Sequence, residues 1–314
     1  MATERRRIGS LEVSLAGLGG NNFGRRLDGA DTRKVVAAAL EAGVTHFDTA
    51  DIYGDGTSET LLGEALARVR DEVVITTKFG MGHLPDGLSG GDPRWVARAC
   101  EQSLRRLGAE TIDLYLLHRP DPLVPIGETL AALNQLIEQG NVREIGCSNF
   151  SAEGLREAHA AAAAAGLRGF ACVQNEYNLL AFGSQREVLV ACDELGLAFV
   201  PYFPLAMGVL SGKYRRGHPL PAQTRLTTAS DPEDEAFVAE RLAAVERLVD
   251  YAERHDHTLL ELALGWLASR PQVASVIAGA MTATQLRDNV AAIGSWRLTP
   301  GEVFEAERLA TIAP

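Results

Sequence analysis

Four polar residues in the N-terminal part of the chain could together move a proton to or from a carbonyl oxygen. They are a carboxylate, a phenol, an ammonium and an imidazole, at Asp48, Tyr53, Lys78 and His118. A phenol has an unperturbed pKa near ~10, and a neighbouring ammonium favours the phenolate and so lowers that pKa. We therefore expect Tyr53 to be a general acid that Lys78 tunes. Asp48 would orient Lys78 and balance its charge, while His118 would orient a carbonyl or relay a proton.

Taken singly, these residues have ordinary structural explanations: a helix cap, a loop aromatic, a surface charge and a buried histidine. Their shared position favours chemistry, because each falls at or just past the end of a short apolar run. Reduction of a carbonyl also needs a hydride at the carbon. The sequence shows no metal-ligand spacing, so we expect no metal and an organic hydride carrier instead.

Strand-like runs alternate with helix-period segments along the chain. Eight runs are typical of strands: Leu15–Leu18, Thr45–Phe47, Val73–Thr76, Leu114–Leu117, Ile145–Cys147, Ala171–Gln174, Ala198–Val200 and Val276–Ile277. Amphipathic segments between them are Asp31–Ala42, Thr57–Arg70, Trp95–Leu107, Ile126–Gln139, Ser151–Ala165 and Ser184–Leu195. Several of these segments end at a glycine, which suits a helix C-terminus.

This alternation predicts an α/β protein with parallel strands, and eight repeats predict a (β/α)₈ TIM barrel that spans residues 1–314 as a single domain. An open doubly wound sheet is the competing fold, but a GxGxxG fingerprint after the first strand is missing. In a barrel, the loops after the strands meet on one face. The four polar residues would meet there.

Two segments depart from the alternation. Arg6–Ile8 and Glu12–Val13 flank Gly9-Ser10, which predicts a short N-terminal β-hairpin that plugs the far end of the barrel. The stretch from Pro201 to about Asp234 predicts a long loop after the seventh strand. Long loops in compact domains are usually lids or binding loops, so we expect this one to close over a ligand.

The composition restricts the function classes. The chain of 314 residues has a net charge of −11 and 46% hydrophobic residues, which argues against nucleic-acid binding and fits a large core. Its four cysteines lie in apolar runs without CxxC spacing, so we expect buried, reduced thiols. The N-terminus lacks a signal-peptide pattern and no apolar run approaches ~18 residues. We expect a cytoplasmic protein without a membrane partner.

Several motifs resemble the aldo-keto reductase family, and their order and spacing carry the resemblance. The main one is Phe47-Asp48-Thr49-Ala50-Asp51-Ile52-Tyr53-Gly54, followed by Glu59 and Gly63-Glu64-Ala65-Leu66. Others are Thr76-Thr77-Lys78, Ile112–His118, Ile145–Phe150, Gln174–Asn178, Pro201–Leu205 and Ile277–Ala280. The resemblance implies a barrel that binds a nicotinamide cofactor across its C-terminal face. It also gives Tyr53 the role of general acid, tuned by Asp48 and Lys78, with His118 orienting the substrate.

The resemblance further implies the cofactor-binding residues. Ser148, Asn149 and Gln174 match positions that bind the nicotinamide carboxamide, and Tyr202 matches the aromatic ring stacked under the nicotinamide. Gly20 and Asn21 would lie beside this pocket. The belt over the pyrophosphate corresponds to Phe203, Pro204, Leu205, Gly208 and Lys213, and the adenine end to Gly279, Gln285 and Asn289.

The adenine end departs from the commoner pattern. Relatives that prefer NADPH usually have a cation after the last strand, whereas Gly279–Gln285 contains none and the first is Arg287. A 2′-phosphate calls for charge-assisted hydrogen bonds, which Arg287 or a residue of the long loop (Arg215, Arg216 or Arg225) would have to supply. Because most of the family uses it, NADP(H) is the favoured cofactor, with NAD(H) as the alternative.

These observations predict an NAD(P)H-dependent oxidoreductase that interconverts aldehydes or ketones, sugar-like ones included, and alcohols. Its partner would be a small-molecule carbonyl or alcohol substrate. The alternative is a cofactor-binding regulatory module of the same fold, similar to potassium-channel β-subunits. A barrel isomerase would need a phosphate-gripping nest after the seventh and eighth strands, without the pairing of Tyr53 and Lys78.

Overall fold

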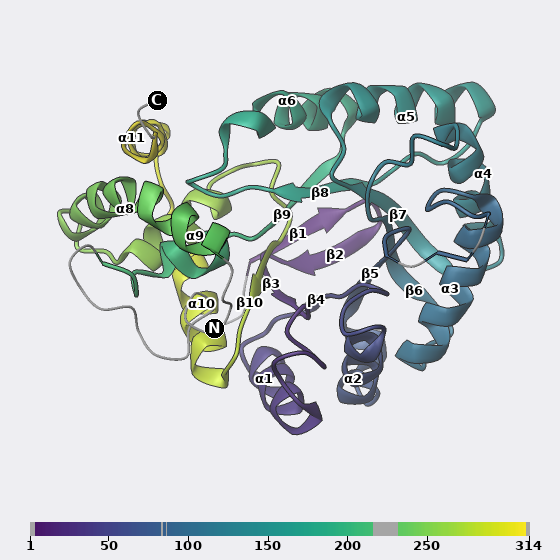
Figure 1. Ribbon diagram of the computed structural model, residues 1–314, viewed down its shortest axis with the longest axis horizontal. Coiled ribbons are helices and arrows are strands. Elements are labelled where there is room, and N and C mark those ends of the chain that lie inside the picture. Colours follow the sequence, from purple (N-terminus) through teal and green to yellow (C-terminus); the bar gives the residue numbers. More distant parts are fainter. Residues whose placement is uncertain (1–3, 83, 86, 216–231, 312–314) are drawn as a thin grey trace.

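The computed structural model shows eight parallel strands that form a nearly closed barrel (Figure 1). It describes residues 4–82, 84–85, 87–215 and 232–311. The barrel strands are β3 (Ala16–Gly19), β4 (His46–Asp48), β5 (Val74–Phe79), β6 (Ile112–Leu117), β7 (Val142–Ser148), β8 (Cys172–Glu176), β9 (Ala198–Tyr202) and β10 (Val276–Gly279). Each strand from β3 to β8 pairs with the next one, and β10 pairs with β3. The predicted fold class is confirmed.

The last seam of the barrel closes just before β10. The Phe199 backbone N–H donates to the Gln272 carbonyl at 2.8 Å, and the Ala274 N–H donates to the Phe199 carbonyl at 2.9 Å. These bonds join β9 to the residues that lead into β10, with Phe199 bridged to Val273. The carboxyl ends of all eight strands therefore share one face.

Helices surround the sheet (Figure 1). They are α1 (Gly29–Glu41), α2 (Thr57–Leu66), α3 (Pro93–Leu107), α4 (Ile126–Glu138), α5 (Ala152–Ala165), α6 (Arg186–Leu195), α8 (Pro232–Glu253), α9 (Leu259–Ala268), α10 (Ala283–Ser295) and α11 (Pro300–Ala310). The described residues also form three 3₁₀ helices: η1 (Arg70–Glu72), η2 (Gly183–Gln185) and η3 (Ala206–Ser211). Gly108, Gly166 and Gly196 end α3, α5 and α6 with positive φ, as predicted.

The second helix is shorter than its apolar pattern predicted. We expected it to run to Arg70, whereas α2 ends at Leu66 and Arg70 begins the separate 3₁₀ helix η1. The Arg70 guanidinium turns toward the sheet and pairs with the buried Asp113 carboxylate of β6 at 2.8 Å. It also donates to the Thr111 carbonyl at 2.6 Å, so a tertiary ion pair replaces the last helical turn.

The predicted hairpin is confirmed as β1 (Arg5–Ile8) and β2 (Leu11–Ser14). Ile8, Leu11 and Val13 are buried and pack in one cluster with residues from the barrel strands. The Ser10 N–H in the turn donates to the Glu144 carboxylate of β7 at 2.8 Å. Because this contact lies near the start of the strands, the hairpin closes the end of the barrel opposite the candidate site.

Part of the predicted lid lies outside the described residues, because its middle corresponds to residues 216–231. The part before that gap contains η3, and the chain resumes in α8. Within the described ranges, no helix combines the length and apolar character needed to cross a membrane. In the same part of the chain, no three His, Cys, Asp or Glu side chains are grouped in a way that could hold a metal ion.

Candidate active site

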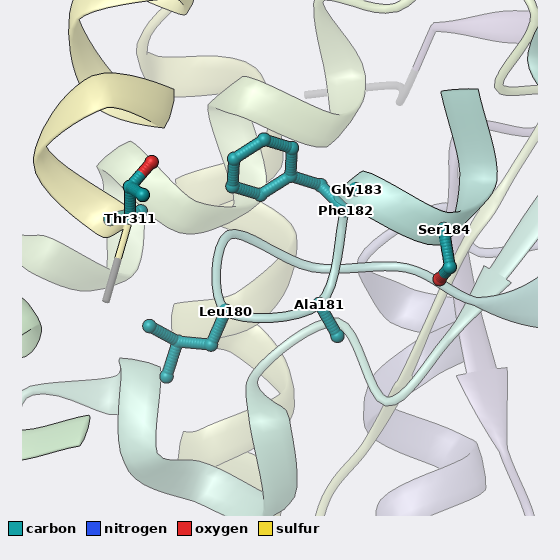
Figure 2. Close-up of a pocket in the computed structure, with 7 residues that line it drawn as sticks. Leu180, Ala181, Phe182, Gly183, Ser184 and Thr311 are labelled. Carbon is teal, nitrogen blue, oxygen red and sulfur yellow. The ribbon is translucent and has the colours of Figure 1, made fainter. Parts of the chain in front are cut away.

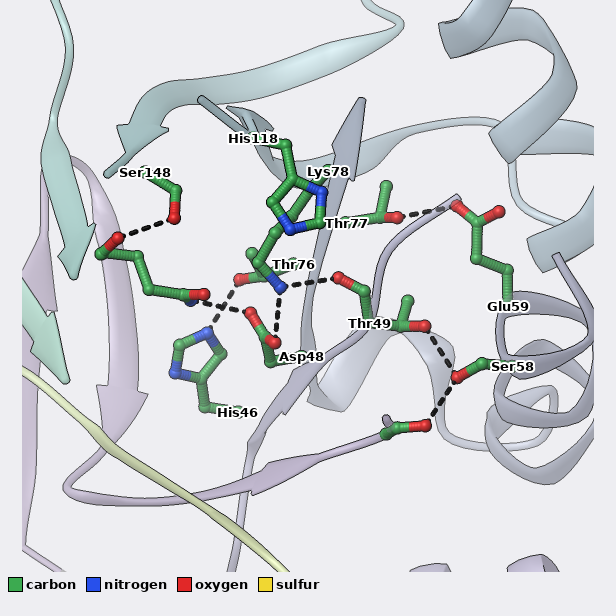
Figure 3. A network of polar contacts seen from close by, with 12 residues as sticks. His46, Asp48, Thr49, Ser58, Glu59, Thr76, Thr77, Lys78, His118 and Ser148 are labelled. Carbon is green, nitrogen blue, oxygen red and sulfur yellow. Dashed lines mark hydrogen bonds and ion pairs between the residues drawn. The ribbon is translucent and has the colours of Figure 1, made fainter. Parts of the chain in front are cut away.

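The carboxyl ends of β4 and β5 bring Asp48 and Lys78 into contact inside the barrel (Figure 3). The Lys78 Nζ donates to the Asp48 Oδ1 at 2.6 Å and to the Thr49 carbonyl at 2.8 Å. Both residues are buried, with exposed fractions of 1% for Lys78 and 4% for Asp48. Burial alone would lower the pKa of Lys78, but the Asp48 charge and contacts with Asp48 and Tyr53 raise that pKa overall. Lys78 is therefore a fixed cation.

Tyr53 lies in the loop after β4, above this ion pair. The Lys78 Nζ is 5.2 Å from the centroid of the Tyr53 ring. Burial raises the pKa of the Tyr53 phenol, and the Lys78 charge and hydrogen bond offset that rise only in part. Lys78 thus lowers the pKa of Tyr53 as expected, but burial outweighs it, so the pKa is above its ordinary value rather than below it. The side chain is a phenol at neutral pH.

His118 directly follows β6 and faces Tyr53. The two ring centroids are 6.1 Å apart, with the rings nearly perpendicular at 80°. Burial and the positive charges of Lys78 and Arg119 lower the pKa of His118 to about 3. Its Nδ1 is buried and has no hydrogen-bond partner among the described residues. His118 is therefore a neutral imidazole at physiological pH, with ring nitrogens suited to hydrogen bonding rather than to carrying charge.

A hydrogen-bond network surrounds Asp48 and Lys78 (Figure 3). Gln174 of β8 donates from its Nε2 to the second Asp48 oxygen at 2.8 Å. His46 of β4 contacts the Thr76 hydroxyl at 2.7 Å inside the barrel. On the opposite side of β5, the Thr77 hydroxyl donates to Glu59 of α2 at 2.6 Å. Sequence reasoning missed this second layer; the alternation of Thr76, Thr77 and Lys78 between the two sides of β5 was the available signal.

Comparisons with known proteins show the family of this chain and agree with its fold. The sequence profile of the Aldo/keto reductase family matches residues 16–310. The chain belongs to this family. It is 33% identical to "Probable aldo-keto reductase 1" of Glycine max, over 100% of this chain and 89% of that protein. Its fold superimposes on a glycerol dehydrogenase of Gluconobacter oxydans with a TM-score of 0.83 and 27% identity, covering 100% and 98% of the two chains.

Aldo-keto reductases generally use NAD(P)H, and the residues predicted to bind the nicotinamide lie beside the tetrad of Asp48, Tyr53, Lys78 and His118. Asn149 has a left-handed backbone with φ of 64°. Its Nδ2 donates to the His118 carbonyl at 2.9 Å, and its Oδ1 accepts from the Tyr202 hydroxyl at 2.8 Å. The Ser148 hydroxyl donates to the Gln174 carbonyl at 2.6 Å. The structure thus brings Ser148, Asn149, Gln174 and Tyr202 together on the side of the tetrad formed by β7 to β9.

Gly20 and Asn21 follow β3 on the same face. The Gly20 N–H donates to the Asp48 carbonyl at 2.7 Å, and a Cβ at Gly20 would come within 2.9 Å of the Ser58 hydroxyl. Only a glycine therefore fits without displacement. Asn21 is partly buried, and its Oδ1 receives a long contact of 3.4 Å from Arg25. Gly20 is therefore packed directly against the Asp48 backbone, and Asn21 follows it in the chain.

The predicted belt after β9 has an unusual backbone. Phe203, Ala206, Met207 and Gly208 all have positive φ, of 51°, 45°, 58° and 96°. Non-glycine residues in this region store strain, which clusters at ligand-binding sites. The Phe203 carbonyl is held by the Asn178 Nδ2 at 3.0 Å. Pro204 and Leu205 complete this turn, and the exposed Lys213 places its Nζ 5.0 Å from the Tyr214 ring centroid.

The adenine-end residues gather around β10 and the start of α10. The Asn289 Nδ2 contacts the Gly279 carbonyl at 3.4 Å, and the Gln285 Oε1 accepts from the Met281 N–H at 2.9 Å. Two of the candidate cations are engaged elsewhere: Arg287 pairs with Glu41 at 3.2 Å and Arg215 with Glu246 at 2.9 Å. Arg216 and Arg225 lie outside the described residues.

A separate hollow of about 290 Å³ lies between the β8–α6 connection and the end of α11 (Figure 2). It is lined by Leu180, Ala181, Phe182, Gly183, Ser184, Ala310 and Thr311. Figure 2 shows the Phe182 ring directed toward the end of α11. Because this lining shares no residue with the tetrad, we treat the hollow as distinct from the candidate active site.

Proposed function

We propose that this protein reduces aldehydes or ketones to alcohols, and catalyses the reverse oxidation, with Tyr53 as the proton donor. The observation that carries the proposal is the buried Lys78–Asp48 pair beneath a protonated Tyr53, with neutral His118 alongside. A phenol, a fixed cation and a neutral imidazole at one strand end suit proton transfer to a carbonyl oxygen. The fold and site fit this chemistry better than a purely regulatory module, which needs no such arrangement.

The proposed mechanism divides the work among the four residues. A bound nicotinamide would supply the hydride. His118, as a neutral imidazole, would donate a hydrogen bond to the substrate carbonyl and place its oxygen near the Tyr53 hydroxyl. The phenolic proton would pass to that oxygen as it gains negative charge, and Lys78 would stabilise the phenolate left on Tyr53. Asp48 would keep Lys78 charged and oriented.

We propose NADP(H) as the preferred cofactor, with Ser148, Asn149 and Gln174 toward the carboxamide and Tyr202 beneath the ring. The belt from Phe203 to Lys213 would cover the pyrophosphate. Arg287 would meet a 2′-phosphate by leaving Glu41. Both partners of that ion pair are more than half exposed, so its loss would have a small energetic effect. If Arg287 stays paired instead, NAD(H) becomes the expected cofactor.

The similarity to a glycerol dehydrogenase supports small, sugar-like substrates in this proposal. A cytoplasmic location stays a prediction. A panel of short hydroxyaldehydes, hydroxyketones and polyols is therefore the first set to assay. The polar Asn21 and Asn22 at the end of β3 favour hydroxylated compounds over purely apolar ones.

The deciding experiment replaces Tyr53 with phenylalanine. We expect Tyr53→Phe to lower kcat for reduction by about 10²- to 10⁴-fold, the usual contribution of a general acid. Titration with NADPH and NADH, followed by protein fluorescence, should give dissociation constants within about two-fold of the wild-type values, because only the proton donor is lost. The same titration determines which cofactor binds more tightly.

A matched control is Tyr251→Phe, which makes the same chemical change in α8, where Tyr251 packs against Trp296 with ring centroids 6.1 Å apart. It should retain wild-type turnover. Near-normal reduction by Tyr53→Phe would contradict the assignment of the proton donor. Tight cofactor binding without turnover of any carbonyl or alcohol in the wild-type protein would instead favour the regulatory module.

A further inference from the structure

Asp51 is a carboxylate close to the tetrad that the proposed mechanism does not use. It lies in the loop after β4, two residues before Tyr53, and its backbone N–H donates to the Lys78 carbonyl at 3.1 Å. The residue as a whole is partly buried, but its Oδ1 atom is fully buried and has no hydrogen-bond partner among the described residues. A buried carboxylate oxygen without a donor is costly, whereas a protonated carboxyl group avoids much of that penalty.

The layer outside β5 and β6 explains why Asp51 lacks a compensating charge. Thr77 of β5 and Tyr115 of β6 are register partners on this side of the sheet. Here Glu59 is fully buried, accepts from Thr77 at 2.6 Å and pairs with Arg106 of α3 at 2.6 Å. The Arg106 guanidinium is thus the cation near both Glu59 and Asp51, and its ion pair is with Glu59.

The ionisable groups around Asp51 come from each neighbouring element: Glu59 of α2, Arg106 of α3, Lys78 of β5, Tyr115 of β6, and Tyr53 in the same loop. Burial and the negative charge of Glu59 raise the pKa of Asp51 to about 7. Arg106, the Ile52 amide and Lys78 oppose this rise without cancelling it. Asp51 can therefore change charge near neutral pH.

We propose that Asp51 is a positioning residue that controls how readily Tyr53 gives up its proton, by itself gaining a proton as the solution is acidified. The proposal rests on the proposed role of Tyr53. An ionised Asp51 places a negative charge near Tyr53 and Lys78, which raises the pKa of the phenol and weakens it as an acid. A protonated Asp51 removes that charge. Carbonyl reduction should then be faster on the acidic side of neutrality.

The expected effect is moderate, because the Asp51 charge has the smallest named influence on the pKa of Tyr53 and acts through space. A coupling of this kind changes the rate of proton donation by roughly three-fold between the two charge states of Asp51. It should appear as an inflection near pH 7 in the kcat profile for reduction. The alcohol oxidation direction should show the opposite trend, because an ionised Asp51 makes the Tyr53 phenolate a stronger base.

The test compares Asp51→Asn with Asp55→Asn across the neutral pH range. Asp55 is an exposed residue of the same loop with φ of 53°. Asparagine tolerates this backbone conformation, so the control changes one carboxyl to an amide without altering the buried layer. We expect the wild type and Asp55→Asn to show the inflection in the kcat profile, and Asp51→Asn to lack it. An inflection that survives in Asp51→Asn would overturn the proposal.

Two measurements without substrate keep the proposal independent of the enzymatic reaction. Ultraviolet titration of tyrosinate, with Tyr53→Phe as the reference, should show Tyr53 ionising at lower pH in Asp51→Asn than in the wild type. Unchanged ionisation would overturn the coupling. If Asp51→Asn fails to fold, ¹³C carboxyl NMR of the wild type decides the matter. An Asp51 resonance that titrates near neutrality supports the proposal, and one that titrates with ordinary aspartates refutes it. Failure of the proposed function would appear only as absent turnover.

Discussion

Replacing Lys78 with methionine should be among the most destabilising single changes in this barrel. Methionine is unbranched and only one atom shorter than lysine, so it keeps most of the packing but removes the charge that faces Asp48. The variant loses the 2.6 Å bond to Asp48 and the 2.8 Å bond to the Thr49 carbonyl, both in a site where Lys78 is 1% exposed. A carboxylate is then buried without its cation.

The magnitude follows from these contacts. Breaking a buried ion pair by removing one partner destabilises by about 3–5 kcal/mol, because the remaining charge is uncompensated. The Gln174 amide still donates to Asp48 at 2.8 Å, and a bond of this kind offsets about 1 kcal/mol. We therefore expect Lys78→Met to lower the free energy of unfolding by about 3 kcal/mol. Urea unfolding followed by circular dichroism measures it.

A double-mutant cycle separates the ion pair from general packing. Asp48→Asn alone leaves Lys78 buried beside a neutral amide and should also be destabilising. The double variant Lys78→Met/Asp48→Asn removes both charges, so its loss should be smaller than the sum of the single losses by at least about 2 kcal/mol. Additive losses, or a Lys78→Met effect below about 1 kcal/mol, would refute the claim that Asp48 depends on Lys78.

Two further predictions concern stability. Burial lowers the pKa of His46 to about 4. The unfolded chain therefore takes up this proton first, and acidification from about pH 7 to about pH 4 should remove about 3 kcal/mol of stability. On the same acidification, His46→Gln should lose correspondingly less stability than the wild type, as measured by parallel urea titrations. The control His159→Gln changes an exposed histidine and should lose as much as the wild type. Equal losses in all three proteins would count against this assignment. A Cβ at Gly63 of α2 would lie 2.2 Å from the Leu107 carbonyl. Gly63→Ala should therefore destabilise by about 2 kcal/mol or more. Gly294→Ala in α10, where a Cβ meets open space, should stabilise by about 0.5 kcal/mol. Similar unfolding midpoints for the two glycine variants would disprove the close helix contact.

The strand–helix alternation predicted most of the fold. It located all eight barrel strands, because buried parallel strands are continuous apolar runs. The ends of the elements were less predictable. Arg70 leaves the predicted helix for a partner on β6, Asp113, and no local pattern contains that information. The hairpin was predictable because Gly9-Ser10 is a local turn signal, whereas its contact with Glu144 of β7 joins residues far apart in the chain.

The sequence also placed the tetrad, since the ends of neighbouring parallel strands must meet on one face. It could not give the second polar layer. Glu59 and Arg106 look like ordinary charges of amphipathic helices. Only the structure shows that Glu59 is fully buried against Thr77 and pairs with the partly buried Arg106, so that both charges act on Asp51. The partner of Arg287 could not be predicted either, because Arg287 contacts Glu41 of α1, a residue remote in sequence.

The acidity of Tyr53 shows most clearly what sequence reasoning left out. Counting neighbours gives one cation, Lys78, and predicts a lowered pKa. In the structure, burial is the largest influence and raises the pKa, while the Asp48 partner of Lys78 also opposes the cation. The opposite charges of Lys78 and Asp48 therefore partly cancel at the Tyr53 phenol. The pair lowers the pKa of Tyr53 only because the influence of Lys78 exceeds that of Asp48. An ionised Asp51 adds one further negative charge to this balance, with a smaller influence on the pKa of Tyr53 than burial, Lys78 or Asp48. Lys78 limits the rise caused by burial. In the proposed mechanism, the proton would stay on Tyr53 until a substrate oxygen develops enough negative charge to take it.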